Sequence, residues 1–540
     1  VNYEKVELYG EEGLLVYAAV DTDLTRRLLR NQFLRMKEED FLSQGRSLMK
    51  THAVPASRVL GKMEYGGVKV DREYLSYLDE KLGAVIEQKS KEISRHWLPS
   101  WGEFNPNSTQ QLGKLLYSEG VFDSSGERRL RLIPGIVDMN EKSRQWKTDK
   151  KTLRGIIEYT EKNSGEKCPF TVALLDYRTA HKVKNGFLVE IRNLSELDQY
   201  LHTNYNIHGT STGRTSSNGI NMQNWPSWSA GFNIKKLLVT DNTEEDLFVN
   251  LDYKGAEIRI FAAYSNDERL INALLDGMDA HCFFTSAVYG IPYEEVLAAA
   301  NDTHPDKKQA KYIKSLRTVI KRVVFGILYG AGAHKIAETA TITLEKAQEV
   351  INLLMSMFPS IRIYVEETRD FIRRYGFVET FFGRRRRFPL HGVGSFFRSQ
   401  ADRRGVNMKI QSTSSDIVIS QLVELDEHVQ EVGGRIVLTV HDSIGLLVKR
   451  KYVEQLPDFL QHYCVTRVKE KYPWLPVPFS CDIEVGDSYG EVTKLSDFIA
   501  AKKAKELSKD KQLEVQFDEE AMEELRDFEN QQTEAVIRSA

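Results

Sequence analysis

Two aspartates at the ends of apolar segments are the first residues in this sequence that could do chemistry. Asp252 follows the apolar residues 247–251, and Asp442 lies in a predicted strand–turn–strand unit over residues 435–448. Two carboxylates brought close together repel each other unless a cation neutralises them. Mg²⁺ is the natural cation, because it prefers oxygen ligands and takes substrate phosphates into its shell. For either segment alone, an aspartate that merely caps a turn explains the pattern as simply.

A second pattern lies on the helix that we predict over residues 311–328. Arg317, Lys321, Phe325 and Tyr329 recur every four residues and therefore form one stripe, whereas the opposite face is apolar. Two cations followed by two aromatic rings suit a nucleotide, with its triphosphate on the cations and its base or sugar against a ring. The alternative is a surface helix with scattered cations, but aromatic residues on the cationic face argue against it.

A third pattern is a segment rich in turns, hydroxyls and amides. Thr210-Ser-Thr-Gly-Arg-Thr-Ser-Ser217 runs into Asn221-Met-Gln-Asn-Trp-Pro226. Such side chains could line a nucleic-acid backbone or a minor groove. Taken alone, the segment is only a polar loop.

The composition bounds what these patterns can mean. The 540 residues are 41% apolar and 28% charged, which is ordinary for a globular protein of several domains. No apolar run is long enough for a membrane span, so we expect no membrane partner. The net charge of −3 does not exclude nucleic acid, since a sum hides local clusters. The four cysteines form no CxxC pair, which favours a reducing, cytoplasmic compartment over a disulfide framework or a zinc site.

Taken together and in this order, the three patterns resemble the family A (polymerase I type) DNA polymerases. Asp252-Tyr-Lys-Gly-Ala-Glu-Ile-Arg259 matches motif A, the stripe that ends at Tyr329-Gly330 matches motif B, and His441-Asp442-Ser443 matches motif C. The Thr-Gly-Arg segment matches the motif that precedes motif A. Residues 104–112 resemble the thumb and residues 379–384 the fingers of this family. The resemblance covers about residues 10–495.

The resemblance implies a mixed α/β right-hand fold, with helices around an antiparallel palm sheet. We expect the following division: an exonuclease-like remnant over residues 1–62, the thumb over 63–200, palm over 201–300, fingers over 301–400, palm again over 401–495, and an acidic tail over 496–540. Within the remnant, Tyr17-Ala-Ala-Val-Asp21 resembles the third motif of the family's 3′–5′ exonuclease, and the other two motifs are absent. We therefore expect a truncated exonuclease and no proofreading by this chain alone.

The resemblance also implies roles for individual residues. Asp252 and Asp442 would bind two Mg²⁺ ions, for which Mn²⁺ could substitute, with help from the backbone carbonyl of Tyr253. Lys321 would join the two aspartates in catalysis by protonating the leaving pyrophosphate, and Glu257 would be a steric gate against a ribose 2′-OH. The dNTP would contact Arg317, Lys321, Phe325, Tyr329, Glu257 and His281. Primer-template DNA would contact Arg214, Gln411, Asn407, His441, Arg403 and Gln223.

Ser443 departs from the family pattern, in which motif C usually ends in Glu. Single-subunit RNA polymerases carry the same His-Asp-Ser, so an RNA polymerase is the alternative, although Glu257 and Phe325-Gly favour DNA. A non-catalytic nucleic-acid-binding remnant would need neither aspartate, and an unrelated phosphohydrolase would not need the Arg/Lys/Phe/Tyr stripe. We therefore predict a template-directed DNA polymerase that extends a primer 3′-OH in replication or repair.

Three further expectations concern regions outside these motifs. The four consecutive arginines at 384–387 would meet template phosphates and make binding strongly salt-dependent. The acidic stretch at 513–529 could bind a separate exonuclease chain or a replication protein, or could be a solvated terminus. The start at Val1 and the divergent motif details suggest a phage-like source, which would place the protein in the host cytoplasm.

Overall fold

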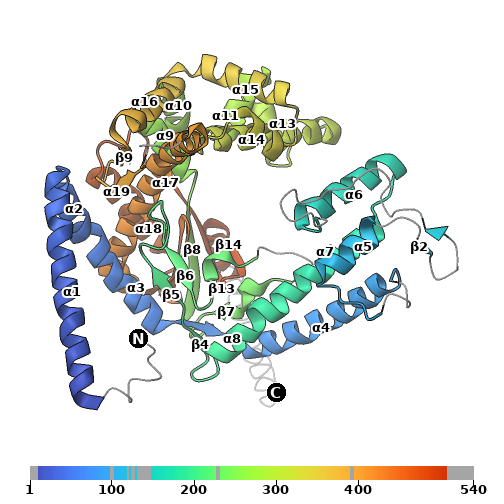
Figure 1. Ribbon diagram of the computed structural model, residues 1–540, viewed down its shortest axis with the longest axis horizontal. Coiled ribbons are helices and arrows are strands. Elements are labelled where there is room, and N and C mark those ends of the chain that lie inside the picture. Colours follow the sequence, from blue (N-terminus) through green and yellow to red (C-terminus); the bar gives the residue numbers. More distant parts are fainter. Residues whose placement is uncertain are drawn as a thin grey trace, which may run out of the picture.

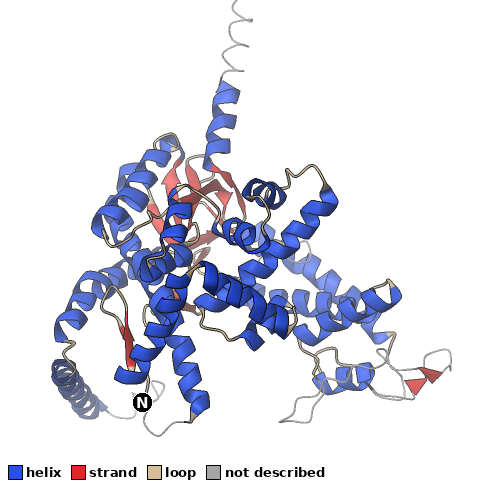
Figure 2. Ribbon diagram, turned by 90° about the horizontal axis from the view of Figure 1, so that it is seen from above, coloured by secondary structure: helices blue, strands red, loops and turns tan. Residues whose placement is uncertain are grey.

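The computed structural model describes residues 10–97, 102–117, 121–122, 128–129, 147–226, 232–389 and 394–506. In this part of the chain an antiparallel sheet lies at the centre, and helices extend from it on several sides (Figure 1). Figure 2 separates the two kinds of element: most strands gather in the middle among helices, and short strands also lie further out. The predicted mixture of helices and an antiparallel sheet is confirmed. The acidic stretch at 513–529 lies outside the described residues.

The central sheet has eight strands in the order β11-β12-β8-β13-β7-β1-β4, with β14 paired to β13. The strands are β1 (Val68–Val70), β4 (Tyr200–Leu201), β7 (Leu238–Val239), β8 (Asp246–Tyr253), β11 (Arg435–Val440), β12 (Ser443–Lys449), β13 (Cys481–Ser488) and β14 (Glu491–Lys494). β8 pairs with β12 on one side and with β13 on the other. Its apolar residues Leu247, Phe248, Val249 and Leu251 are therefore buried by both neighbours and by helices, and only Asn250 interrupts the apolar run.

A long helix, α17 (Ser395–His428), crosses the sheet and packs with α9 (Ala256–Ser265) and α3 (Val54–Gly66). Its inward residues Ile410, Ile417 and Leu422 belong to the same buried cluster as Leu251 of β8. This packing fixes β8 of the sheet relative to α17 and α9. The elements that carry the candidate site residues are thus joined by one apolar core.

The helices at the top of Figure 1 form a separate lobe that includes the predicted helix with the cationic stripe. The lobe contains α10 (Glu268–Leu275), α11 (Ala280–Tyr289), α12 (Tyr293–Ala300), α13 (Lys307–Leu328), α14 (Ala333–Ala340), α15 (Leu344–Met357), α16 (Pro359–Tyr375), β9 (Phe377–Glu379) and β10 (Arg385–Arg387). α13 confirms the helix predicted over 311–328 but begins at Lys307. It begins earlier because the carboxylate of Asp306 caps it, accepting from the amides of Lys308 and Gln309 at 2.7 and 3.0 Å.

A second helical arm leaves the sheet on the right of Figure 1. It is made of α4 (Arg72–Ser94), α5 (Thr109–Tyr117), α6 (Lys150–Ser164), α7 (Pro169–Val183) and α8 (Val189–Leu194), with short strands β2 (Val121–Phe122) and β3 (Arg128–Arg129). α4 begins after Asp71, whose carboxylate caps the helix by accepting from the Tyr74 amide at 2.9 Å. α4 packs against α7 along its length.

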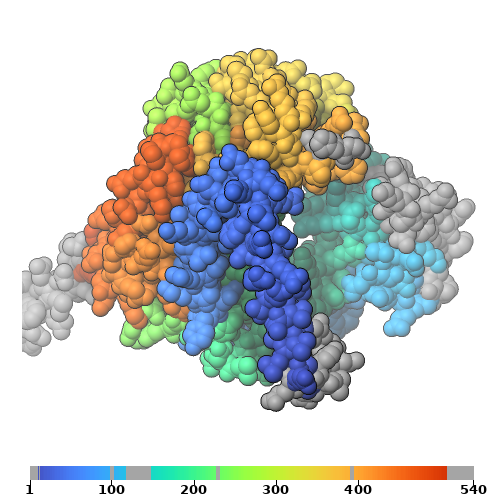
Figure 3. Space-filling model, turned by 60° about the vertical axis from the view of Figure 1, so that its left-hand side comes forward, coloured from blue at the N-terminus to red at the C-terminus, as the bar shows by residue number. Residues whose placement is uncertain are grey.

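The N-terminal helices lie on the opposite side of the sheet, where Figure 1 shows α1 (Gly10–Glu38) apart from the body, and Figure 3 brings this side to the front. α2 (Leu42–Leu48) and α3 connect α1 to the sheet. Tyr17 and Asp21 both lie within α1, whose apolar residues Leu15, Leu24 and Leu28 are 56–70% exposed. Among the described helices, none combines the length and the apolar character needed to cross a membrane.

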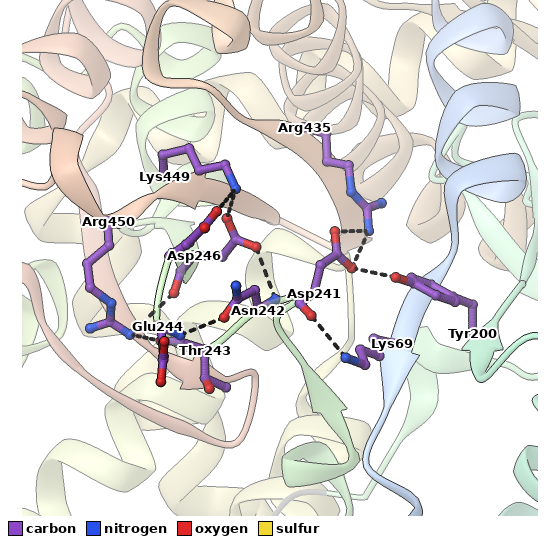
Figure 4. A network of polar contacts seen from close by, with 11 residues as sticks. Lys69, Tyr200, Asp241, Asn242, Thr243, Glu244, Asp246, Arg435, Lys449 and Arg450 are labelled. Atoms are coloured by element: carbon purple, nitrogen blue, oxygen red, sulfur yellow. Dashed lines mark hydrogen bonds and ion pairs between the residues drawn. The ribbon is translucent and has the colours of Figure 1, made fainter.

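A polar network links the two strands at the ends of the sheet order, β11 and β4, through the loop between β7 and β8 (Figure 4). The Asp241 carboxylate accepts two hydrogen bonds from Arg435 of β11, both at 3.1 Å, and one from the Tyr200 hydroxyl of β4 at 3.1 Å. Lys69 of β1 donates to the Asp241 carbonyl at 2.9 Å. The loop between β7 and β8, which carries Asp241, therefore connects β1, β4 and β11, which are distant from one another in sequence.

Candidate active site

The two aspartates meet at one end of the sheet. Asp252 is next to last in β8, and Asp442 lies in the two-residue turn between β11 and β12. The Tyr253 amide donates to the Asp442 carbonyl at 3.2 Å, which joins strand end and turn directly. His441, the other turn residue, has a positive φ of 54°, as tight hairpin turns require at their first central position.

The protein around this end of the sheet disfavours charge on both carboxylates. Burial and then the charges of Asp442 and Asp482 raise the pKa of Asp252 to about 6. Burial also raises the pKa of Asp442, although Arg214 at 3.9 Å opposes the shift. One carboxylate oxygen of Asp442, Oδ1, is buried without a hydrogen-bond donor. Two adjacent acids with too few donors are an arrangement that a cation would stabilise.

The residues present fit Mg²⁺ better than a metal that demands a complete protein cage. Within the described residues, no three His, Cys, Asp or Glu side chains gather closely enough to hold a metal by themselves. Mg²⁺ commonly takes only one or two carboxylates and completes its shell with water and substrate phosphates. The pair Asp252 and Asp442, with the Tyr253 carbonyl, supplies that kind of incomplete oxygen set.

Glu257, at the start of α9, is the centre of a hydrogen-bonded group beside the aspartates. Its carboxylate accepts from Arg214 at 2.7 Å, from the Tyr329 hydroxyl at 3.0 Å and from the Gln411 amide at 3.4 Å. Burial raises the pKa of Glu257, and the Arg214 guanidinium opposes that shift. Glu257 and Tyr329 were assigned to the dNTP, and Arg214 and Gln411 to the primer-template. All four therefore meet at the Glu257 carboxylate, although they come from four separate segments of the chain.

The stripe on α13 is present, and each member has a distinct environment. Arg317 donates to both oxygens of Asp279, at 3.0 and 3.1 Å. Lys321 has no ion-pair partner among the described residues, and its ammonium lies 6.0 Å from the Phe325 ring centroid. Phe325 contacts Tyr329 and also His281, at centroid distances of 5.9 and 5.4 Å. Among the described residues, Lys321 is therefore the cation of the stripe without a carboxylate partner, whereas Arg317 is paired with Asp279. Phe325 and Tyr329 add an aromatic surface.

His281 joins this group from α11. Burial lowers the pKa of its imidazole to about 4, and its Nδ1 is buried without a partner. The low pKa keeps this imidazole neutral near pH 7, where it packs against the Phe325 ring of the stripe.

Close backbone packing sets where the end of α13 sits relative to α17. Gly330 has a positive φ of 64°, and a Cβ added there would lie 2.7 Å from the Cα of Arg403. Arg403 itself donates to Ser399 at 2.7 Å and keeps a partly exposed side chain on α17. Only glycine fits this contact, so the position of the neighbouring Tyr329 relative to α17 is fixed.

The remaining residues assigned to primer-template DNA have different positions. Asn407 is partly buried on α17 with an unpaired Oδ1, and His441 is exposed in the turn. Gln223 is buried, and its amide donates to Thr215 at 2.9 Å and to the Thr439 carbonyl at 3.1 Å. Gln223 therefore ties the Thr-Gly-Arg loop to β11 and is not presented to a ligand in this structure.

Three of the four arginines at 384–387 form ion pairs within the protein, and their contact with template phosphates stays a prediction. Arg384 pairs with the fully buried carboxylate of Asp416 at 2.6 Å. Arg385 pairs with Glu379, and Arg387 pairs with Glu39. These arginines join the β9–β10 hairpin to α17 and to the end of α1, because each buried or half-buried guanidinium finds a carboxylate there.

Sequence reasoning missed Asp482, which lies beside the aspartate pair. In the sheet register, Asp252 is flanked by Ser443 on β12 and by Asp482 on β13. Asp482 also pairs with Lys254 at 2.6 Å. The alternating segment at 481–486 indicates a strand, but nothing in the sequence reveals which residue that strand places next to Asp252.

Comparisons with known proteins identify the family of this chain. A family model described as DNA polymerase family A matches residues 72–491. DNA polymerase I of Chloroflexus aurantiacus is 30% identical over 485 residues, covering 89% of this chain and 47% of that protein. The thermostable DNA polymerase I of Thermus aquaticus is 30% identical over 469 residues, covering 86% of this chain and 50% of that protein. The chain spans about half the length of these curated relatives.

A solved structure has a similar fold. It is described as the POL domain of Pol1 from M. smegmatis in complex with DNA primer-template and dNTP. It aligns with a TM-score of 0.70 at 25% identity, covering 85% of this chain and 73% of that chain. Because the family model and these relatives each match most of its length, this chain belongs to DNA polymerase family A.

Proposed function

We propose that this chain is a template-directed DNA polymerase, which adds dNTPs to a primer 3′-OH in replication or repair. The observation that carries the proposal is that the pair Asp252 and Asp442 lies beside the group of hydrogen bonds centred on Glu257. The Tyr329 hydroxyl donates to Glu257 and so joins this group to the stripe of α13. Family membership supports the same reaction. The related M. smegmatis structure contains primer-template and dNTP, which are the ligands proposed here.

We assign the nucleotide triphosphate to the cations of α13. Lys321, with no carboxylate partner among the described residues, is available to bind phosphate oxygens and to protonate the leaving pyrophosphate. Arg317 would share its guanidinium between Asp279 and the phosphates. Phe325 and His281 would contact the nucleotide beside them, and Tyr329 would lie near the templating base.

We assign sugar selection to Glu257. Its side chain is 6% exposed and is held from three directions, so it cannot move aside at little cost for a 2′-OH. Arg214, Gln411 and Asn407 would face the minor groove of the nascent base pairs, where correct pairs of either orientation offer acceptors. Arg214 would have to exchange Glu257 for DNA in that role.

The aspartates would hold the metal. Asp252, Asp442 and the Tyr253 carbonyl would bind two Mg²⁺ ions, for which Mn²⁺ could substitute. When bound, such ions activate the attacking hydroxyl and neutralise charge on the transferred phosphate. The raised pKa values of both aspartates and the unpaired Oδ1 of Asp442 support this assignment.

The proposal also covers the domain division, the source and further partners. The division into thumb, palm and fingers follows the helical arms and the sheet, with an exonuclease-like remnant before the thumb. α1 carries the Tyr17 and Asp21 of that remnant, and we assign no proofreading to it. The expectation of a phage source rests on the sequence alone, because the relatives named above are bacterial. A separate exonuclease or replication partner for the acidic tail also remains a proposal from sequence.

The test is primer extension on a DNA template with Mg²⁺, in parallel reactions that contain dNTPs or rNTPs. Extension mainly with dNTPs supports the proposal. Extension mainly with rNTPs would favour the RNA polymerase reading, which rests on Ser443 opposite Asp252. Tight binding of primer-template without extension by either set would favour a non-catalytic remnant.

A further inference from the structure

An arginine to which no ligand has been assigned joins the end of β8 to the segment that leads into β13. Arg259, in the first turn of α9, donates from Nε to the Lys254 carbonyl at 3.0 Å. Its Nη1 donates to the Pro478 carbonyl at 2.9 Å, and its Nη2 donates to Ser480 Oγ at 2.8 Å. A planar guanidinium holds several acceptors in one fixed geometry. Arg259 therefore fixes the turn after β8 against the residues that precede β13.

The backbone at the end of β8 sets the direction of the Tyr253 carbonyl. The Lys254 amide donates to the Ser480 carbonyl at 2.9 Å, so this N–H points toward the β13 side. The peptide between Tyr253 and Lys254 is trans, and a trans peptide directs its C=O opposite to its N–H. The Tyr253 amide donates to the Asp442 carbonyl on the other side of the strand. The Tyr253 carbonyl therefore faces the side on which Asp442 lies.

Arg259 holds this peptide in place through both of its neighbours. Ser480 accepts twice, at its carbonyl from the Lys254 amide and at its Oγ from Arg259. The Lys254 carbonyl, at the next peptide, also accepts from Arg259. Without the guanidinium, the bond between the Lys254 amide and Ser480 would lose the contacts that hold its two ends. The Tyr253 carbonyl would then no longer be kept in one direction.

We propose that Arg259 is a positioning residue for cation binding, which keeps the Tyr253 carbonyl directed toward a metal held by Asp252 and Asp442. The proposal rests on the proposed polymerase function and deepens its metal assignment. It also fixes the sign of the effect. Removing a positive charge near carboxylates would by charge alone strengthen cation binding. Releasing an oriented oxygen ligand would weaken it, as the loss of partners that orient metal ligands does.

The experiment measures Mn²⁺ binding to the full chain through the electron paramagnetic resonance signal of the free ion. Asp442→Asn, which removes a proposed ligand, identifies the part of the binding that belongs to this site. We expect Arg259→Ala to bind Mn²⁺ about tenfold more weakly than the wild type. Arg259→Lys keeps the charge but cannot reach three acceptors at once, so it should also bind more weakly, by a smaller factor. Single-turnover primer extension should slow in the same order.

Arg450→Ala is the matched control, because Arg450 has the corresponding role at the start of β8 (Figure 4). It donates to the carbonyls of Thr243 and Asp246 at 2.7 and 3.3 Å and pairs with Asp487 of β13. The two ends of this eight-residue strand are about 20 Å apart. Both alanine variants should lower the urea midpoint, but Arg450→Ala should leave the affinity for Mn²⁺ unchanged.

Ser480→Ala provides a milder change in case Arg259→Ala does not fold. It removes the Oγ that accepts from Arg259 and keeps the backbone bond between Ser480 and Lys254. We expect about threefold weaker binding of Mn²⁺, as the loss of one hydrogen bond would cause.

Three results would overturn the proposal while the wild type still extends primers. The first is Mn²⁺ binding by Arg259→Ala that is as tight as in the wild type or tighter. The second is an equal loss of Mn²⁺ affinity in Arg259→Ala and Arg450→Ala, which would reduce the effect to general stability. The third, if Arg259→Ala does not fold, is wild-type affinity in both Arg259→Lys and Ser480→Ala. A wild type that neither binds Mn²⁺ at this site nor extends primers would instead contradict the polymerase function itself.

Discussion

Arg214 and Glu257 form an ion pair at 2.7 Å in the middle of the candidate active site, and the same guanidinium lies 3.9 Å from Asp442. The pair links the residue proposed to sense the minor groove with the residue proposed to select the sugar. Because the Tyr329 hydroxyl also donates to Glu257, the end of α13 is tied to the same carboxylate. Binding of DNA and nucleotide would therefore have to rearrange one shared group of hydrogen bonds.

Replacing Glu257 should weaken discrimination against ribonucleotides. Glu257→Ala removes the side chain that would occupy the space of a 2′-OH, and we expect the preference for dNTP over rNTP to fall about tenfold or more. The measurement is kcat/KM for one dNTP and its matching rNTP. Tyr329→Phe is the control, since it removes only the hydroxyl that donates to Glu257. A loss of sugar discrimination in Tyr329→Phe but not in Glu257→Ala would contradict the assignment.

Gly330→Ala should disturb the contact between α13 and α17. The added Cβ would meet the Arg403 backbone at 2.7 Å, at a φ that side chains rarely adopt. We expect a loss of about 1 kcal/mol or more in the free energy of unfolding and a higher KM for dNTP. Gly332→Ala is a matched control two residues away, because no atom lies within 4 Å of its Cβ and its φ is −80°. Equal effects of the two substitutions, in urea unfolding and in KM, would disprove the close contact.

The acidic pair should make the metal-free protein less stable as pH rises. The folded-state pKa of Asp252 is raised to about 6, above its value in an unfolded chain. The contribution of Asp252 to the free energy of unfolding is therefore fully present at low pH, where the carboxyl is protonated, and is lost as pH rises through about 6. In EDTA, Asp252→Asn should raise the urea midpoint relative to wild type at pH 7.5 but have little effect at pH 4. A larger gain at pH 4 than at pH 7.5 would contradict the sign of the shift.

Much of the site could be predicted because its signals are local. The four-residue spacing of Arg317 to Tyr329 places the stripe on one face of a helix whatever the tertiary fold is. The apolar runs before Asp252 and Asp442 likewise predict strand ends. These patterns needed no knowledge of which elements pack together.

What could not be predicted depends on pairing between distant segments. Asp482 becomes a neighbour of Asp252 only through the register of β13 with β8. Arg384 is half-buried against the buried Asp416 of α17, a partner that the sequence of the arginine run does not reveal. Gln223 was assigned to DNA by its motif, yet the Thr439 carbonyl of β11 accepts from its amide.

The measurement that tests the central claim most directly is single-turnover primer extension by Asp442→Asn, with primer-template affinity measured on the same preparation. Asn keeps the shape of the turn residue but removes the charge that would hold the metal. We predict an affinity close to that of wild type and an extension rate lower by about a thousandfold, as expected for the loss of several kcal/mol of transition-state stabilisation. Asp276→Asn, which neutralises an exposed carboxylate at the end of α10, should leave both unchanged. Extension by Asp442→Asn within tenfold of wild type would contradict the account.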